Sequence, residues 1–135
     1  SSMTELDVLA LYNNLLTGTL PPSWSSMQQL KDLRVYGNSL TGSIPETWAT
    51  FPSMLYLRLY DNMLTGTVPE SFNTMTNLQI LYIGQNDLTG TLHNSWSSMT
   101  SLIGLDIQKS SVSGTLPSSW SSMTAIESIY LDETQ

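Results

Sequence analysis

The 135-residue chain contains no cysteine, one histidine, and only four basic residues against eleven acidic ones. Without cysteine it can form no disulfide, no cysteine-ligated zinc site and no thiol nucleophile. The net charge of −7 argues against nucleic acid as a partner, because phosphates require a basic surface. It argues equally against adhesion to an anionic membrane surface.

Long apolar runs are also missing. No stretch of 18 apolar residues occurs, so we expect no membrane insertion of this segment. No secretory leader opens the sequence, and no Asn-x-Ser/Thr glycosylation acceptor occurs. Ser1-Ser2-Met3 repeats the Ser-Ser-Met found at 25–27, 97–99 and 121–123. We therefore expect the sequence to begin inside a repeat of a longer parent chain.

A repeat of 24 residues runs through the whole sequence. Residues 54–69 fit the template L-x-x-L-x-L-x-x-N-x-L, followed by Thr-Gly-x-apolar-Pro. Six copies of the first part begin at Leu6, Leu30, Met54, Leu78, Leu102 and Ile126. Such units bury their apolar edges against one another in a stack. We expect a single leucine-rich repeat array over residues 1–135, of about five and a half repeats, without a linker.

Each repeat carries its own local signals. The alternation in Leu57-Arg58-Leu59 predicts a short strand, and successive copies predict a parallel sheet with strands roughly 4.8 Å apart. The expected fold is an α/β-class, right-handed solenoid with few helices and the sheet on its concave face. A Trp or Phe and then a Met or Phe follow each turn, and we expect them on a short 3₁₀ or helical turn at the back. The asparagines that should bond buried backbone groups in the turn are Asn14, Asn38, Asn62 and Asn86.

Three departures from the repeat carry their own expectations. Ser110 replaces the turn asparagine, which predicts a looser fifth turn, and His93 replaces a proline, which predicts an exposed turn residue. Neither end has a polar cap, so we expect open core and end-to-end self-association. The residues expected in that open core are Met3, Leu6, Leu9 and Leu11 at one end and Trp120, Met123, Ile126 and Ile129 at the other.

Catalytic and metal-binding patterns are absent from the sequence. His93 is not placed beside a candidate nucleophile, and the glycines are spaced one per repeat rather than gathered in a phosphate loop. Asp61, Asp87 and Asp106 do not recur at ligand-like spacing. The sequence therefore predicts a protein that is not an enzyme and has no cofactor or metal.

The outward-facing positions of the strand segments have a distinct composition. We call positions 2, 3, 5, 7 and 8 of the six copies the strip; they hold all six tyrosines, all four basic residues and seven of the eleven acids. Solenoid curvature makes such a face concave, and Tyr and Arg are enriched in binding hot spots. The predicted ligand-binding residues are Tyr12, Arg34, Tyr36, Tyr56, Arg58, Tyr60, Asp61 and Tyr82.

Two columns of the strip allow more than one interpretation. Position 7 holds tyrosines in three consecutive repeats, which predicts an aromatic ladder, although tyrosines also favour strands for their own sake. Arg34 and Arg58 share position 5, where Asp32 and Asp61 are near enough to neutralise them in surface ion pairs. Alternatively, the arginines hold a carboxylate or other anion of a partner.

The Leu-Thr-Gly-x-Ile-Pro core resembles the plant-type leucine-rich repeats of receptor-kinase ectodomains. The Pro-x-Ser-Trp-Ser-Ser-Met phrase at 21–27 and 117–123 resembles trypanosomatid surface antigens, notably the promastigote surface antigen of Leishmania and the related proteophosphoglycans. That second resemblance implies a cell-surface or secreted protein that contacts host receptors or complement.

Three functions are consistent with these observations. The first is a protein-binding module of a surface antigen that binds a host protein through its concave strip. The second is a structural spacer or coat element without a specific ligand. The third is a segment of a plant-type receptor ectodomain that recognises a peptide.

Overall fold

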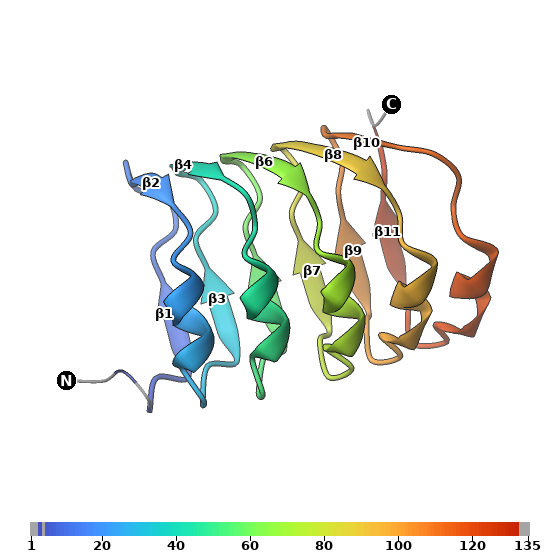
Figure 1. Cartoon of the computed structure of the whole chain (residues 1–135), viewed down its shortest axis with the longest axis horizontal. Coiled ribbons are helices and arrows are strands. Elements are labelled where there is room, and N and C mark those ends of the chain that lie inside the picture. The colour runs from blue at the N-terminus through green and yellow to red at the C-terminus, as the bar shows by residue number, and fades with distance from the viewer. Residues whose placement is uncertain (1–2, 4, 133–135) are drawn as a thin grey trace.

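The computed structural model describes residue 3 and residues 5–132. The chain winds through successive coils that lie side by side along one axis (Figure 1). A full coil contributes one strand to each of two parallel sheets and one short 3₁₀ helix. The predicted solenoid, with parallel strands and few helices, is confirmed.

The first sheet has six strands in the order of the chain. Leu33 pairs with Leu57, and Leu57 with Leu81, so the register advances by one sequence repeat per strand. These leucines are fully buried, while the residues on either side of each leucine face outward as predicted. The strands are β1 (Val8–Ala10), β3 (Asp32–Arg34), β5 (Tyr56–Arg58), β7 (Ile80–Tyr82), β9 (Gly104–Asp106) and β11 (Ser128–Tyr130).

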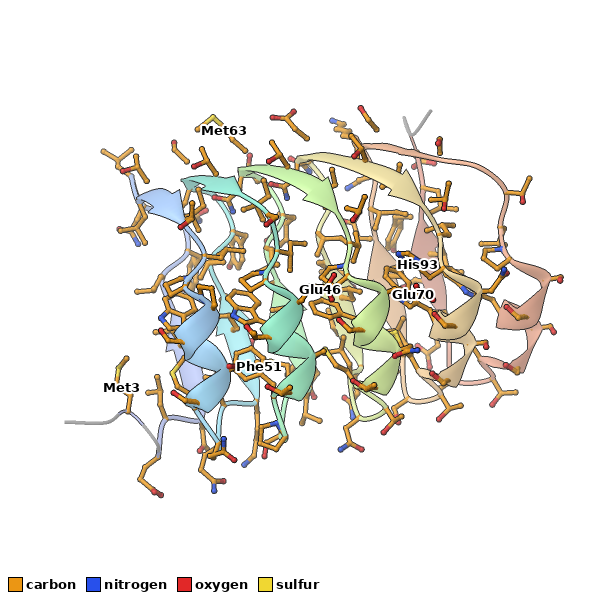
Figure 2. All side chains as sticks on the ribbon, in the orientation of Figure 1. Met3, Glu46, Phe51, Met63, Glu70 and His93 are labelled. Carbon is orange, nitrogen blue, oxygen red and sulfur yellow. The ribbon has the colours of Figure 1, made fainter. Side chains whose placement is uncertain are left out.

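The opposite side of each coil is the 3₁₀ turn that the sequence predicts. Its aromatic residue packs inward: Trp48 and Phe72 are fully buried, and Phe51 also points into the core (Figure 2). The Trp48 indole Nε1 donates to the Pro21 carbonyl of the preceding coil at 3.1 Å, which ties neighbouring coils together at the back. The helices are η1 (Pro22–Ser26), η2 (Glu46–Thr50), η3 (Glu70–Thr74), η4 (Asn94–Ser98) and η5 (Ser118–Ser122).

A second parallel sheet forms where the sequence predicts only turns and bends. Its five strands lie along the edge of the solenoid between the first sheet and the helices (Figure 1). Outward residues on it are polar or isolated apolar groups such as Met63, which points to solvent (Figure 2). The strands are β2 (Thr17–Thr19), β4 (Ser39–Gly42), β6 (Met63–Thr67), β8 (Asp87–Thr91) and β10 (Ser111–Ser113).

The repeated glycine is required by this second sheet. Gly42 has a φ of +75° and Gly90 a φ of +94°, which L-residues rarely adopt. A Cβ at Gly42 would also lie 2.9 Å from Cγ2 of Thr19 on the preceding coil. Glycine therefore supplies the left-handed backbone conformation, and at Gly42 it also leaves room for the preceding coil to approach closely.

Three of the four predicted asparagines each bond four backbone groups in two coils, whereas Asn14 in the first coil bonds, among the residues that the structure describes, only the Leu11 and Tyr12 carbonyls of its own coil. Asn62 Nδ2 donates to the carbonyls of Leu59 and Tyr60 in its own coil, at 3.0 and 3.3 Å, and to Val35 of the preceding coil at 3.1 Å. Its Oδ1 accepts the Leu40 amide of that preceding coil at 3.1 Å. Asn38 and Asn86 repeat this pattern, which confirms the predicted ladder.

Ser110 breaks the ladder but not the strand that follows it. Its Oγ donates to the Ile107 carbonyl at 2.7 Å and accepts the Val112 amide at 3.4 Å, both within its own coil. Among residues 5–132, the shorter side chain bonds only groups of its own coil. Strand β10 still pairs with β8, so the predicted loosening is limited to the lost amide bonds.

Two expectations about individual residues were wrong. His93 is half-buried rather than exposed: its Nε2 lies 3.0 Å from the Val68 carbonyl, and its ring contacts Trp96. Trp120 and Met123 are buried rather than open core, because Trp120 stacks on Trp96 at 6.0 Å and its Nε1 donates to the His93 carbonyl. The other end is closer to expectation, since Met3 is exposed.

Asn62→Ala should lower the free energy of unfolding by about 1–3 kcal/mol, because the four backbone groups lose their amide partner. Chemical denaturation with equal m-values for the two proteins measures this difference. An unchanged midpoint would contradict the ladder.

Ser110→Asn should have the opposite effect and raise stability by about 1 kcal/mol. Asn86 bonds the Leu59 carbonyl and the Leu64 amide of its preceding coil. One repeat later, the new amide should reach the Ile83 carbonyl and the Leu88 amide in the same way. Thermal denaturation with a higher midpoint than the parent protein is the expected result; a lower midpoint would show that this turn has no room for the amide.

Candidate ligand-binding strip

The strand register of the first sheet places the predicted site residues in columns. Arg34 pairs with Arg58, Arg58 with Tyr82, and Tyr82 with Asp106. The 24-residue period thus brings residues that are far apart in sequence onto neighbouring strands. The side chains at position 5 form one row across the sheet, and those at position 7 form a second.

The predicted tyrosine ladder is present at position 7. The ring centroids of Tyr12 and Tyr36 lie 4.8 Å apart with 11° between their planes. Those of Tyr36 and Tyr60 lie 4.4 Å apart with 9° between planes. Each stacked pair contributes about 0.5–1.5 kcal/mol beyond the burial of its area. The result is a continuous aromatic surface over three coils.

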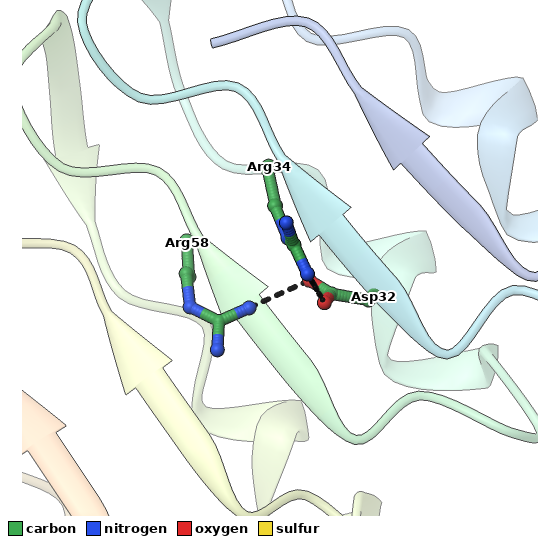
Figure 3. Close-up of polar contacts among 3 residues, drawn as sticks. All are labelled: Asp32, Arg34 and Arg58. Carbon is green, nitrogen blue, oxygen red and sulfur yellow. Dashed lines mark hydrogen bonds and ion pairs between the residues drawn. The ribbon is translucent and has the colours of Figure 1, made fainter.

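Asp32 holds the two arginines. Its Oδ2 accepts Nε and Nη2 of Arg34 at 3.0 and 2.7 Å, and its Oδ1 accepts Nη1 of Arg58 at 2.7 Å (Figure 3). The Asp32 side chain is only 9% exposed. One buried carboxylate therefore offsets two cations, and the cluster keeps a net charge of +1 on an acidic protein. Asp61, also expected to neutralise the arginines, is exposed and forms no ion pair within the described part of the chain.

A hollow of about 320 Å³ lies between these groups. Tyr82 bounds it on one side, and this tyrosine lies over Gly104 of the next strand, where an added Cβ would be 3.1 Å from the phenol oxygen. Because Gly104 has no side chain, the Tyr82 ring can lie against its backbone. The hollow is lined by Arg34, Tyr36, Arg58, Tyr60 and Tyr82.

The ionisation of the strip favours hydrogen-bond donation in its N-terminal half. The hydrogen bond and the charge of Asp32 raise the pKa of Arg34, so this guanidinium stays protonated. Burial and the neighbouring Tyr36 raise the pKa of the Tyr60 phenol, which therefore remains neutral and able to donate. Burial also raises the pKa of Asp106 in the C-terminal half, against the hydrogen bonds from Gln108 that lower it.

The structure brings most of the predicted residues together. Five of them line the hollow, Tyr12 extends the ladder, and the Tyr56 ring lies 5.1 Å from Cζ of Arg58 in a cation–π contact. Two structuring residues, Asp32 and Gly104, are missing from the predicted set. Both stand at position 3 of their repeats, two residues before position 5, which holds the arginines and Tyr82. That place on the strip could have identified them.

Within residues 3 and 5–132, no three His, Asp or Glu side chains gather as a metal site would require. None of the helices in that part of the chain has the length and apolar character needed to cross a membrane.

Removing both arginines should destabilise the fold through Asp32. In Arg34→Ala/Arg58→Ala the Asp32 carboxylate loses the hydrogen bonds of both cations, at a cost of about 1–3 kcal/mol. Adding Asp32→Asn removes that charge and should recover most of the loss, as urea denaturation of the two variants can measure. Equal stability of the double and triple variants would show that Asp32 does not depend on the arginines.

Comparisons with known proteins agree with this architecture. Two leucine rich repeat family models match consecutive segments, residues 5–27 and 28–88, which together exceed half of the chain. A search of curated proteins finds no match.

Many solved structures are similar to the chain. The ectodomain of the Arabidopsis thaliana receptor kinase GASSHO1/SCHENGEN3, in complex with CASPARIAN STRIP INTEGRITY FACTOR 2, is 27% identical with a TM-score of 0.95 over 98% of this chain and 16% of its own. The Arabidopsis receptor kinase HAESA, in complex with the peptide hormone IDA and the co-receptor SERK1, is 29% identical with a TM-score of 0.91 over 96% of this chain and 22% of its own.

A third similar structure is smaller. The BIR3–SERK2 complex from Arabidopsis thaliana contributes a chain that is 27% identical, with a TM-score of 0.84 over 94% of this chain and 66% of its own. The present chain thus spans about a fifth of the length of the two larger receptors. The repeat, the two parallel sheets and the family matches lead to one assignment: the chain is a leucine-rich repeat protein.

Proposed function

We propose that this chain is the ligand-binding segment of an extracellular leucine-rich repeat protein, and that it binds a protein or peptide across the strip. One observation carries the proposal: five predicted residues, two arginines and three tyrosines, line one hollow of about 320 Å³. Arginine and tyrosine combine apolar area with directed donors and are the residue types enriched in binding hot spots.

The chemistry of the hollow favours an extended segment that carries a carboxylate. Arg34 and Arg58 concentrate positive charge on a chain whose net charge is −7. The neutral Tyr60 phenol adds a donor, and the stacked tyrosines offer a flat apolar surface. Three stacked rings cover two strand spacings, roughly 10 Å, which about three extended residues would span.

The similar solved structures support a peptide or protein as the ligand. The HAESA structure contains a peptide hormone and a co-receptor, and the GASSHO1/SCHENGEN3 structure is an ectodomain of a membrane receptor kinase. This likeness supports a location outside the cell or at its surface. The role proposed for the strip is protein or peptide binding without catalysis.

The finer assignment concerns the source of the ligand. The Pro-x-Ser-Trp-Ser-Ser-Met phrase supports a parasite surface antigen whose partner is a host receptor or complement protein. The solved relatives support instead a receptor segment that recognises a peptide. The sequence of the complete gene distinguishes them: a lipid-anchor signal fits the antigen, and a membrane span followed by a kinase fits the receptor.

One observation favours the structural-spacer alternative. Asp32 already pairs with both arginines, and the three tyrosines already stack on one another. A strip that satisfies its own groups needs no ligand to be stable. Binding therefore has to be tested directly.

The test is a selection of linear peptides from a random display library on the immobilised protein. We expect enriched peptides to carry Asp or Glu near an aromatic or apolar residue. The triple variant Asp32→Asn/Arg34→Ala/Arg58→Ala should bind them at least about tenfold more weakly, a loss of about 1.4 kcal/mol or more. Tyr36→Ala/Tyr60→Ala should weaken them similarly, because it removes the stacked surface.

Lys109→Gln is the matched control, since it removes one positive charge from the strip outside the hollow. Gln85 occupies the equivalent position with φ 52°, against 51° for Lys109, so glutamine fits this backbone. The control should keep wild-type affinity. If the library yields no binder, or if binders tolerate both strip variants, the spacer function replaces the proposed one.

A further inference from the structure

The two arginines of the hollow use different edges of their guanidinium groups. Arg34 donates from Nε and Nη2 together to one oxygen of Asp32, at 3.0 and 2.7 Å. These two nitrogens form the side-on fork with which arginine binds a carboxylate in bidentate fashion. In Arg34 this fork is occupied by the protein itself.

Arg58 presents the opposite arrangement. It contacts Asp32 only through Nη1, at 2.7 Å, and its Nε and Nη2 hydrogen-bond to no residue that the structure describes. Figure 3 shows this edge turned away from Asp32, on the side of the neighbouring strand β7. Its register partner on β7 is Tyr82, which lines the same hollow. The free fork therefore faces the space that a ligand would enter.

The Arg58 guanidinium is also held in place before any ligand arrives. The Tyr56 ring lies 5.1 Å from its Cζ, and Asp32 fixes its Nη1. Its side chain is 25% exposed, against 39% for Arg34. A donor pair that is already oriented and partly desolvated loses little conformational entropy when it binds an anion.

We propose that Arg58 alone contacts the ligand carboxylate, through Nε and Nη2, while Asp32 and Arg34 are positioning residues. This inference rests on the proposed function and assigns separate roles within the strip. The Asp32 carboxylate next to the fork disfavours a dianion, so the expected ligand group is a singly charged, planar carboxylate. It can come from an Asp or Glu side chain or from a peptide C-terminus.

The chain has two arginines, so its Nε–H region in ¹H–¹⁵N NMR spectra holds two signals, which Arg34→Lys and Arg58→Lys assign. The probes are acetyl-Gly-Asp-Gly-amide for a side-chain carboxylate, acetyl-Gly-Gly-Gly with a free C-terminus, and acetyl-Gly-Asn-Gly-amide as the neutral control. With the two carboxylate probes we expect a saturable shift of the Arg58 signal, none of the Arg34 signal, and no response to the neutral probe. The carboxylate probe with the lower Kd identifies the preferred source.

Charge-conserving variants separate the two roles. Arg58→Lys keeps the charge but loses the fork, so the apparent Kd from backbone amide shifts of β5 and β7 should rise about fivefold or more. Arg34→Lys should change it less than about twofold. In Asp32→Asn, a near-isosteric change, the fork of Arg34 is released and its Nε–H signal should now respond to the carboxylate probes. Lys109→Gln should behave as the wild type.

Equal responses of the two arginines in the wild type, a response of Arg34 alone, or no response of either would overturn the assignment. So would a carboxylate affinity that is unchanged by Arg58→Lys. If such a result accompanies selected peptides that still depend on the strip, only this division of roles fails. If Arg58 responds as expected but no peptide depends on the strip, the proposed function fails and the carboxylate site remains.

Discussion

The side-chain amide that bridges adjacent coils is the constraint on which the rest of the structure depends. A coil of this size cannot satisfy the backbone groups in its tight turn by itself, and burying them unpaired would cost several kcal/mol. The Asn62 side chain satisfies four of these groups: two carbonyls of its own coil, and a carbonyl and an amide of the preceding coil. Stability and register are therefore produced by the same contact.

A fixed register is what turns a repetitive sequence into a functional surface. Because each strand is displaced by one repeat from its neighbour, residues at one repeat position form a row across the sheet. The stacking of Tyr36 between Tyr12 and Tyr60, and the convergence of Arg34 and Arg58 on Asp32, both follow from that displacement. A slip of one residue would send these side chains into the core.

The parts that sequence could predict are those set by periodicity. The alternation around Arg58 fixed which side chains face outward, and the spacing fixed that Tyr36 and Tyr60 are neighbours. Periodicity does not determine rotamers, so the sequence could not show that Asp32 rather than Asp61 is the shared counter-ion of the two arginines. The same holds for the different edges that the two arginines present.

Other features escaped prediction because their local sequence has two structural solutions. The glycine of Leu40-Thr-Gly-Ser43 predicts a bend, yet the positive φ at Gly42 is compatible with a strand once the preceding coil lies against it. His93 stands where other repeats have a proline, and a turn position suggested exposure. Its long side chain instead reaches the Val68 carbonyl of the preceding coil.

The most direct test is a crystal structure of the protein with a peptide selected on it. We expect an extended peptide across β3, β5 and β7, with a carboxylate on the free edge of Arg58 and an apolar side chain on the tyrosine ladder. A peptide bound to the second sheet, or to the helices at the back, would contradict this expectation.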